Sequence, residues 1–272
     1  MITSNYHTHT HRCKHARGTV SEYARSALET GITILGMSDH TPLPDRNWPH
    51  VRMEMEELDG YEAEISTARK VYPSVTILKG MECDWKRDYY SFYAEELSDR
   101  RNFDYLIGAV HWFPYRGKWI SAYEVTSHRQ LPAYGAFFIE AMESGLFLFM
   151  AHPDAFGAGY GDWDSEALAC SRDIAAAAEE LQVPLEINGY GFRKMKKNTP
   201  SGERFLYPLP EFWEAVAQYN VSGVCNSDAH KPEHVAASIS DGVRLARKHG
   251  IPLVDPLETA QTREKPFSPV CT

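Results

Sequence analysis

Several features that would point to a nucleic-acid binder or a membrane protein are missing from this chain of 272 residues. Positive charge is scarce, because 28 lysines and arginines face 37 aspartates and glutamates and leave a net charge of −9. An acidic surface repels phosphate backbones, so we do not expect nucleic-acid binding. No apolar run approaches the roughly 18–20 residues that span a bilayer, and the first residues lack the basic start and apolar stretch of a signal peptide. We therefore expect a soluble, cytoplasmic protein.

Cysteine is also scarce, and its spacing excludes two kinds of small stabilised fold. The five cysteines form no CxxC pair and are odd in number: Cys13, Cys83, Cys170, Cys225 and Cys271. This excludes a disulfide framework and a zinc ribbon. Low-complexity linkers and internal repeats are absent as well, while 43% hydrophobic residues suffice for a sizeable core. We expect a single domain over residues 1–272.

Short apolar runs that suit strands alternate with amphipathic or alanine-rich stretches that suit helices. The predicted strands are Ile2–Tyr6, Ile32–Met37, Val75–Met81, Tyr105–Val110, Leu146–Met150, Pro184–Ile187 and Ser222–Cys225. The predicted helices are Val20–Thr30, Met53–Tyr72, Tyr89–Arg101, His128–Ser144, Ser165–Leu181, Leu209–Tyr219 and Glu233–His249. Recurring β–α units predict a parallel α/β fold, and seven of them fit a closed barrel better than an open sheet, which the pattern does not exclude. Gly31 and Gly145 each precede a strand, where a left-handed helix end is expected.

Histidine, by contrast, is abundant: the chain has 12, and five of them lie in the first 40 residues. Each predicted strand ends at, or is soon followed by, a histidine or an acidic residue; Glu186, for example, ends the sixth strand. In a parallel barrel the carboxyl ends of all strands meet at one mouth, where enzymes of this architecture carry out their chemistry. The candidate metal ligands at these ends are His7, His9, His15, His40, Glu82, His111, His152, Asp228 and His230.

Imidazole and carboxylate donors in this mixture suit Zn, Fe or Mn and disfavour Mg or Ca. Nine donors exceed the need of one ion, so we expect two or three divalent ions with a carboxylate bridging a pair. Taken singly, these residues have plainer explanations: a lone His-x-His is a weak signal, and Glu82 or Asp228 alone could cap a helix. Such explanations give no reason for the regularity along the strands. Metal clusters of this kind activate water near neutral pH and clamp the oxygens of a phosphoryl displacement.

One basic run, Arg193–Lys197, follows the sixth predicted strand. Arg193 is nearest to the strand end, and a planar guanidinium can bind phosphate through two parallel hydrogen bonds. We therefore predict that Arg193 binds the substrate phosphate and stabilises its charge during catalysis. The three lysines of the run are expected to be solvated. Lys14, between two of the candidate histidines, is a weaker candidate for substrate binding.

The motifs around the candidate ligands form a set: His7-Thr-His9, Cys13-x-His15-Ala16, Ser38-Asp39-His40, Gly80-x-Glu82, His111, His152-Pro153, Glu186-x-Asn188 and Ser227-Asp228-Ala229-His230. Together they resemble the PHP (polymerase and histidinol phosphatase) superfamily, from His7 to about Gly250. Arg52-Met53, Arg193 and Tyr207-Pro208 make the chain similar, more narrowly, to the monofunctional histidinol-phosphate phosphatases.

The resemblance implies a distorted (β/α)7 barrel with a trinuclear site at the carboxyl ends of its strands. One ion would be held by His7, His9, Glu82 and Asp228, a second by the bridging Glu82 with His111 and His152, and a third by His15, His40 and His230. Asp39 would orient a ligating imidazole, as such residues commonly do.

The resemblance also implies hydrolysis of L-histidinol phosphate, a small phosphomonoester, to L-histidinol and phosphate. One alternative is a related phosphoesterase that acts on another small phosphate ester or on a nucleotide. A second is an exonuclease module that edits nucleic acid, which the charge of −9 disfavours. A third is a non-catalytic remnant, which the intact ligand set disfavours.

Overall fold

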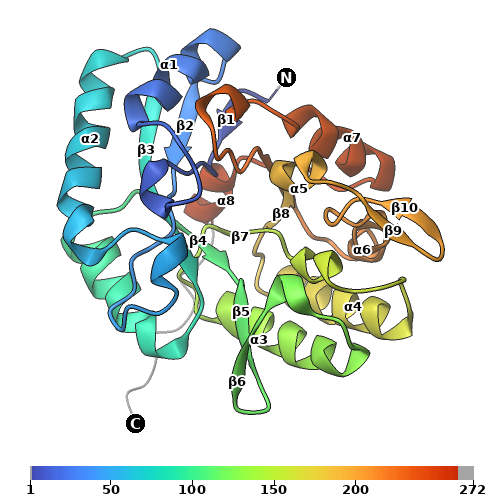
Figure 1. Ribbon diagram of the computed structural model, residues 1–272. Coiled ribbons are helices and arrows are strands. Elements are labelled where there is room, and N and C mark those ends of the chain that lie inside the picture. Colours follow the sequence, from blue (N-terminus) through green and yellow to red (C-terminus); the bar gives the residue numbers. More distant parts are fainter. Residues whose placement is uncertain (1, 263–272) are drawn as a thin grey trace.

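The computed structural model describes residues 2–262, and seven of its strands form one parallel sheet that curls into a barrel (Figure 1). Every strand pairs in parallel with the next one along the sheet. The order around the sheet is β1 (Ser4–Asn5), β2 (Ile34–Met37), β3 (Thr76–Asp84), β4 (Tyr105–Ala109), β7 (Phe149–Met150), β8 (Leu185–Asn188) and β11 (Gly223–Asn226). All seven predicted strands are therefore confirmed, and so is the parallel α/β class.

The barrel closes between the first and last of these strands just beyond their carboxyl ends. Thr8 and Ala229 form a parallel bridge there. The backbone N–H of His9 donates to the Ala229 carbonyl at 2.8 Å, and the N–H of Ala229 donates to the His7 carbonyl at 3.2 Å. The closure thus ties the segment that follows β1 to the segment that follows β11, and both segments carry candidate ligands.

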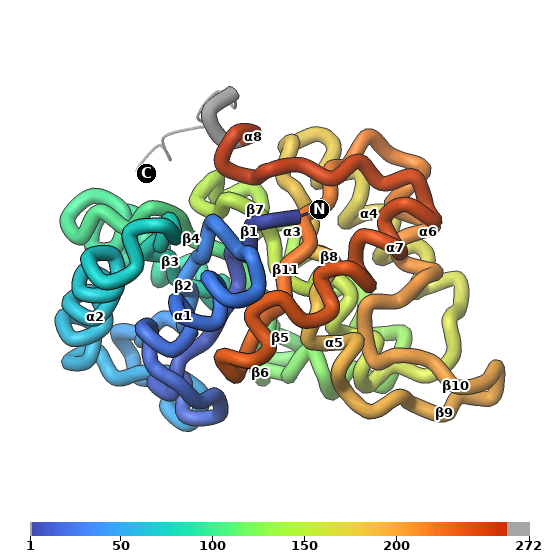
Figure 2. Tube along the Cα trace, turned by 90° about the horizontal axis from the view of Figure 1, so that it is seen from above, coloured from blue at the N-terminus to red at the C-terminus, as the bar shows by residue number. Residues whose placement is uncertain are grey.

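Helices cover the outside of the barrel. Figure 2, turned by 90°, shows β1 near the middle, with α2 and α6 at opposite edges of the molecule. The helices are α1 (Val20–Thr30), α2 (Leu58–Val71), α3 (Leu131–Glu143), α4 (Ser165–Glu180), α5 (Gly189–Arg193), α6 (Pro210–Val216), α7 (Ile239–His249) and α8 (Pro256–Thr262). Among residues 2–262, no helix is long and apolar enough to cross a membrane.

Local sequence explains where several helices begin and end. α1 has the predicted bounds because Thr19 and Glu22 form a capping box at its start and Gly31, at φ 78°, ends it. Gly145 likewise has a positive φ, of 68°. The predicted helix 89–101 is instead a π-helical segment, Phe92–Arg100. α7 starts later than predicted, because Ser238 takes a left-handed conformation, with φ 61°, directly before it.

Two hairpins were not predicted: β5 (Trp112–Tyr115) with β6 (Lys118–Ser121), and β9 (Lys197–Thr199) with β10 (Gly202–Arg204). Both follow barrel strands and extend from the mouth side. The predicted domain runs to residue 272, and its last ten residues, including Cys271, lie outside the described residues.

A tyrosine fills the inside of the barrel beneath the mouth. Tyr105 is buried, and its hydroxyl donates to the Tyr6 carbonyl at 2.6 Å across the barrel. The ring leaves no room for side chains on two neighbouring strands: a Cβ on Gly36 would lie 2.0 Å from the Tyr105 hydroxyl, and one on Gly80 would lie 2.3 Å from its ring. These glycines therefore serve packing, and the filled interior supports the residues above it.

Candidate metal centre

The nine candidate ligands come together at the carboxyl ends of the strands. Segments after β1, β2, β4, β7 and β11 supply the histidines and Asp228, while Glu82 lies within the last part of β3. Eight of the nine are buried, and His15 is exposed. Their ligand atoms form three groups, each compact enough to surround one ion.

The first group contains His7, His9, Glu82 and Asp228. The Nε2 atoms of both histidines lie 3.4 Å from Glu82 Oε2. Asp228 Oδ1 lies 3.6 Å from His7 Nε2 and 3.2 Å from His9 Nε2. Ligand atoms that surround one ion at about 2.1 Å stand roughly 3.0–3.4 Å apart, so these spacings suit a shared ion.

The second group contains Glu82, His111 and His152. Here the other carboxylate oxygen is used, because Glu82 Oε1 lies 2.9 Å from His152 Nε2 and 3.6 Å from His111 Nε2. Glu82 therefore presents Oε1 to this group and Oε2 to the first group, which is the geometry of a bridging carboxylate, and Oε2 also lies 2.9 Å from Nδ1 of His40.

The third group contains His15, His40 and His230. The Nε2 atoms of His15 and His230 lie 3.0 Å apart. His15 is fixed by its other ring nitrogen, which lies 2.7 Å from the Cys13 carbonyl and is placed to donate to it. His230 also approaches the first group, with its Nδ1 3.3 Å from Asp228 Oδ1.

Several buried polar atoms in these groups lack a hydrogen bond, which is the mark of atoms placed for a cation. They are His7 Nε2, His9 Nε2, His40 Nδ1, Glu82 Oε2 and Asp228 Oδ1. Burial lowers the pKa of His9, His15 and His40, that of His15 to about 3, so their lone pairs are free at neutral pH. Burial opposes charge on Glu82 and Asp228, but the neighbouring histidines hold the pKa of both carboxyls well below the usual range. Neutral imidazoles and ionised carboxylates are the donor set that a divalent transition metal requires.

Glu186 orients the first group from below. It is fully buried in β8, and its Oε1 accepts a hydrogen bond from His7 Nδ1 at 2.8 Å. Although burial opposes charge on His7, the surrounding carboxylates raise its pKa well above the usual value, Glu186 most of all. Asn188 donates to Glu186 Oε2 at 2.8 Å and to Asp228 Oδ2 at 3.0 Å. Such partners fix the ring and the carboxylate so that their other atoms face the ion.

Asp84 orients the second group in the same way. Its Oδ1 accepts from His111 Nδ1 at 2.9 Å, and its Oδ2 accepts from Arg52 Nη2 at 2.7 Å. Burial opposes the charge of Asp84, but His111 and Arg52 together keep its pKa below the usual value. The buried Arg52 thus supports His111 through Asp84.

Two ligands lie on strained backbone. His152 has φ 30° and Asp228 has φ 47°, in the left-handed region that residues other than glycine avoid. Strain of this kind persists where the surroundings fix it, most often at functional sites. The backbone N–H of His152 donates to Glu186 Oε2 at 3.2 Å, which helps to hold the first of these turns.

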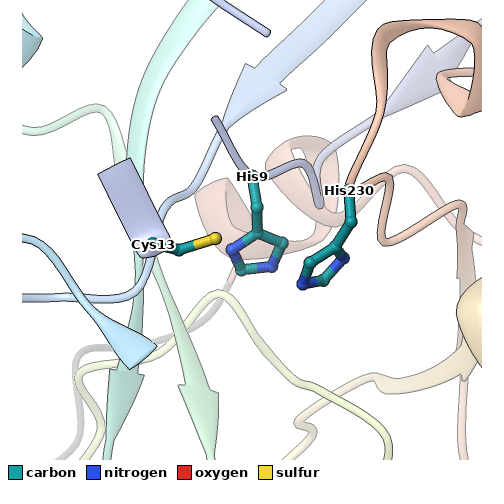
Figure 3. A group of neighbouring side chains, drawn as sticks. All are labelled: His9, Cys13 and His230. Carbon is teal, nitrogen blue, oxygen red and sulfur yellow. The ribbon is translucent and has the colours of Figure 1, made fainter. Parts of the chain in front are cut away.

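Cys13 lies beside His9 and His230, and Figure 3 shows its sulfur turned toward the His9 ring. Burial raises the pKa of this thiol, so it stays neutral in the absence of a metal ion. Its position close to the buried Nδ1 of His9 makes it a packing partner of that ring.

Residues 5–189 match the PHP domain family. This span is more than half of the chain. The chain belongs to the PHP domain family.

The proteins that resemble this PHP domain are named as phosphatases. A Deinococcus radiodurans protein named "Probable histidinol-phosphatase" is 32% identical over 256 residues, which is 90% of this chain and 92% of that protein. A "Probable phosphatase" of Shewanella sediminis is 27% identical over 201 residues, or 71% of this chain and 66% of that protein. A crystal structure of the histidinol phosphate phosphatase of Lactococcus lactis, complexed with zinc, L-histidinol and phosphate, aligns with a TM-score of 0.72 at 17% identity. The alignment covers 93% of this chain and 96% of the other, and confirms the distorted barrel fold.

Three other residues predicted for the site of this PHP domain have partners that the sequence did not indicate. Asp39 accepts hydrogen bonds from the Thr10 N–H at 2.8 Å and the Thr10 hydroxyl at 2.7 Å, so among the described residues it fixes the backbone after His9 and not an imidazole. The Lys14 ammonium pairs with Glu54 and donates to the Pro49 carbonyl at 2.6 Å, which leaves it half-exposed at the surface.

Arg193 also differs from the prediction. Its Nη1 donates to the carbonyls of Gly189 and Ala237, at 2.9 and 3.1 Å. Its Nη2 donates to the carbonyls of Ser227 and Asp228, at 2.7 and 3.2 Å. The guanidinium therefore fastens the turn that presents Asp228, and in the described part of the chain Arg193 is not among the residues that line the pocket. Phosphate binding by Arg193 does not fit this geometry.

A pocket of about 230 Å3 opens above the ligand groups. Its lining residues are His9, His15, His40, Val51, Glu82, His111, Trp112, Tyr123, Tyr190, Lys194, Asp228 and His230. The one lysine among them is Lys194, which was predicted to be solvated. The chain turns after α5, so Lys194 points to the pocket while Arg193 points to the backbone behind Asp228.

Sequence reasoning assigned no role to Asp84 and Arg52, and left Glu186 outside the predicted site. A signal existed for Asp84, because it stands two residues after Glu82 and therefore on the same face of β3. Glu186 gave a similar signal, as an acidic residue at the end of a buried strand. No comparable signal exists for Lys194, because its direction depends on hydrogen bonds made by its neighbour.

Proposed function

We propose that this chain is a metal-dependent phosphomonoesterase that hydrolyses L-histidinol phosphate to L-histidinol and phosphate. The observation that carries the proposal is the position of Glu82, whose two oxygens face two separate groups of histidines. The choice of histidinol phosphate as the substrate rests on the name of the Deinococcus radiodurans relative and on the ligands of the Lactococcus lactis structure.

In this proposal three ions of Zn, Fe or Mn occupy the three ligand groups. Such ions, when bound, lower the pKa of water and neutralise the oxygens of a phosphoryl group. The protein's part is to hold them close together with seven neutral or hydrogen-bonded imidazoles and two carboxylates. Glu186 and Asp84 keep the rings of His7 and His111 turned toward them.

The pocket suits a small ester better than a polymer. Its volume of about 230 Å3 is modest, and its walls carry the aromatic rings of Trp112, Tyr123 and Tyr190. Flat apolar walls of this kind accept a planar ring such as an imidazole. The net charge of −9 suits the ammonium of histidinol phosphate and opposes nucleic acid. The proposal includes a cytoplasmic location, because that is where a small biosynthetic substrate of this kind would be met.

The test is a phosphate-release screen across small phosphomonoesters, nucleotides and a single-stranded oligonucleotide, with metal content measured on the same preparation. The Glu82→Ala variant, purified in parallel, reports any contaminating phosphatase. We expect histidinol phosphate to give the highest kcat/KM and the protein to carry two to three equivalents of metal. A higher kcat/KM on another small ester would instead support the broader phosphatase activity for which the Shewanella sediminis relative is named. Less than one equivalent of metal after reconstitution would overturn the metal-dependent proposal.

A further inference from the structure

Lys194 presents its ammonium group to the pocket from within a cage of tyrosines. Its Nζ lies 4.7 Å from the ring centre of Tyr190, 5.0 Å from that of Tyr123 and 5.3 Å from that of Tyr207. Aromatic faces attract a cation and hold it in place, but they accept no hydrogen bond of normal strength. The cage therefore positions the ammonium without satisfying its three donors.

The cage spans the ligand groups. Tyr190 stacks on His230 of the third group, with ring centres 4.6 Å apart. On the other side, Tyr207 and Tyr123 lie 6.2 and 6.4 Å from His152 of the second group. An anion that enters the pocket and reaches the ligand groups therefore comes close to Lys194 as well.

The neighbouring cations are already engaged. Lys196 pairs with Glu203 at 2.8 Å, at the exposed surface. Lys197 donates to the carbonyls of residues 158, 159 and 160, and Arg193 donates to the four carbonyls given above. Within residues 2–262, the Lys194 ammonium has neither a hydrogen bond nor an ion pair.

A partly buried ammonium without a hydrogen bond or an ion pair is energetically unfavourable when no ligand is bound. Losing water disfavours the charged form of an amine, and burial lowers the pKa of Lys194 below its usual value. Asp228 offsets this loss only in part, because its Oδ1 faces His7 and His9, its Oδ2 accepts from Asn188, and within residues 2–262 it forms no ion pair with Lys194. A bound anion would give the ammonium the partners that it lacks.

We propose that Lys194 binds the phosphoryl oxygens of the substrate and is the phosphate-recognising residue of this pocket. The inference rests on the proposed phosphatase function and adds to it the side chain that selects a phosphate ester. It also transfers to Lys194 the task that the sequence assigned to Arg193.

Three variants test the proposal: Lys194→Met, which keeps the length of the side chain and removes its charge; Lys194→Arg, which keeps the charge; and Lys196→Met, a control in the same loop. Each is compared with the metal-loaded wild type. The measurements are the Kd of inorganic phosphate by calorimetry, the shift in Tm caused by phosphate, metal content, and kcat and KM for histidinol phosphate.

We expect Lys194→Met to weaken phosphate binding and to raise KM roughly ten- to a hundred-fold, as the loss of a charge-assisted contact does, with metal content unchanged. Lys194→Arg should recover part of the lost phosphate binding, because it keeps the charge but changes the shape of the cation that the tyrosines hold. The control should match the wild type. Phosphate binding in Lys194→Met equal to that in Lys196→Met would overturn the proposal.

Phosphate binding is measured without turnover, so failure of this inference can be told apart from failure of the proposed function. If the wild type hydrolyses histidinol phosphate and Lys194→Met behaves like the control, the inference alone fails. If no phosphomonoester is hydrolysed but phosphate binds the wild type and not Lys194→Met, the inference stands and the proposed function fails.

Discussion

At the scale of single residues, the role of each side chain in the site depends on which ligand group its nitrogen or oxygen atoms face. Glu82 is the clearest case, because its two oxygens lie 3.4 Å from His9 Nε2 and 2.9 Å from His152 Nε2, respectively. His15, by contrast, belongs to one group and is exposed. Removing these two side chains should therefore have different consequences.

Glu82→Ala should empty two groups together, since it leaves two adjacent cations without their shared negative charge. His15→Ala should empty only the third group. Elemental analysis of dialysed protein distinguishes the two cases, and wild type purified in parallel gives the reference stoichiometry. Equal metal loss in the two variants would contradict the bridging role of Glu82.

Arg193 is the residue whose predicted and observed partners differ most. Because its guanidinium holds the carbonyls of Ser227 and Asp228, Arg193→Ala should lower the free energy of unfolding by about 1.5–3 kcal/mol. It should also weaken metal binding in the first group, since Asp228 loses the support of its strained turn. Urea unfolding and metal analysis measure both effects.

Arg193→Lys should restore little, because one ammonium cannot reach four carbonyls. Normal stability and metal content with a raised KM would instead return Arg193 to the phosphate-binding role predicted from the sequence.

At the scale of elements, one long connection is tied to the metal groups by a single buried arginine. Arg52 lies in the segment after β2 and holds two earlier residues of that segment. Its Nη1 donates to the Thr41 carbonyl at 2.8 Å, and its Nε donates to the Trp48 carbonyl at 3.2 Å. The Trp48 ring stacks on Trp112, a pocket residue, with centres 4.3 Å apart. Arg52 lies 5.7 Å from the centre of each ring.

Arg52→Met should cost about 3–5 kcal/mol of unfolding free energy, because it leaves the buried Asp84 without its cation. The ion of the second group should bind more weakly, since Asp84 no longer holds His111 as firmly. Chemical unfolding and metal titration report the two effects. The exposed Arg46, paired with Glu56 at 3.3 Å, provides the control, and Arg46→Met should change stability by less than about 1 kcal/mol.

Adding Asp84→Asn to Arg52→Met removes the unpaired charge and should recover part of the lost stability. No recovery in the double variant would show that Arg52 acts through packing against the two tryptophans and not through its charge.

At the scale of the whole molecule, the mouth depends on a filled barrel interior. Gly80→Ala forces a methyl group against the Tyr105 ring and should cost about 1–3 kcal/mol of unfolding free energy. Gly60→Ala is the matched control, because its nearest neighbour is 3.8 Å away on an exposed side of α2, and it should stabilise by about 0.5–1 kcal/mol. Thermal unfolding of both variants measures the difference, and equal effects would contradict the packing role of Tyr105.

The sequence by itself determined the parallel α/β class and the polar residues that end its strands, while the closure of the sheet into a barrel came from the structure. Alternation of strands and helices is a local property, and so is the position of a polar residue relative to the strand before it. Once the strands are parallel, their carboxyl ends must meet, so His7, Glu82, His111, His152 and Asp228 converge whatever the details of packing. The convergence of the candidate ligands could therefore be predicted, whereas their division into three metal sites came only from the family resemblance and stays a prediction.

Only the tertiary structure decided which partners are taken by the basic side chains near the site and by the acidic residues that support the ligands. Arg193 and Lys194 are adjacent, yet carbonyls from the segment after β11 capture the first, while tyrosines from three different segments surround the second. Asp39 likewise bonds to Thr10 and leaves the orientation of His7 to Glu186. Which partner a charged side chain takes is a competition among groups far apart in sequence, and folding alone sets the distances that settle it.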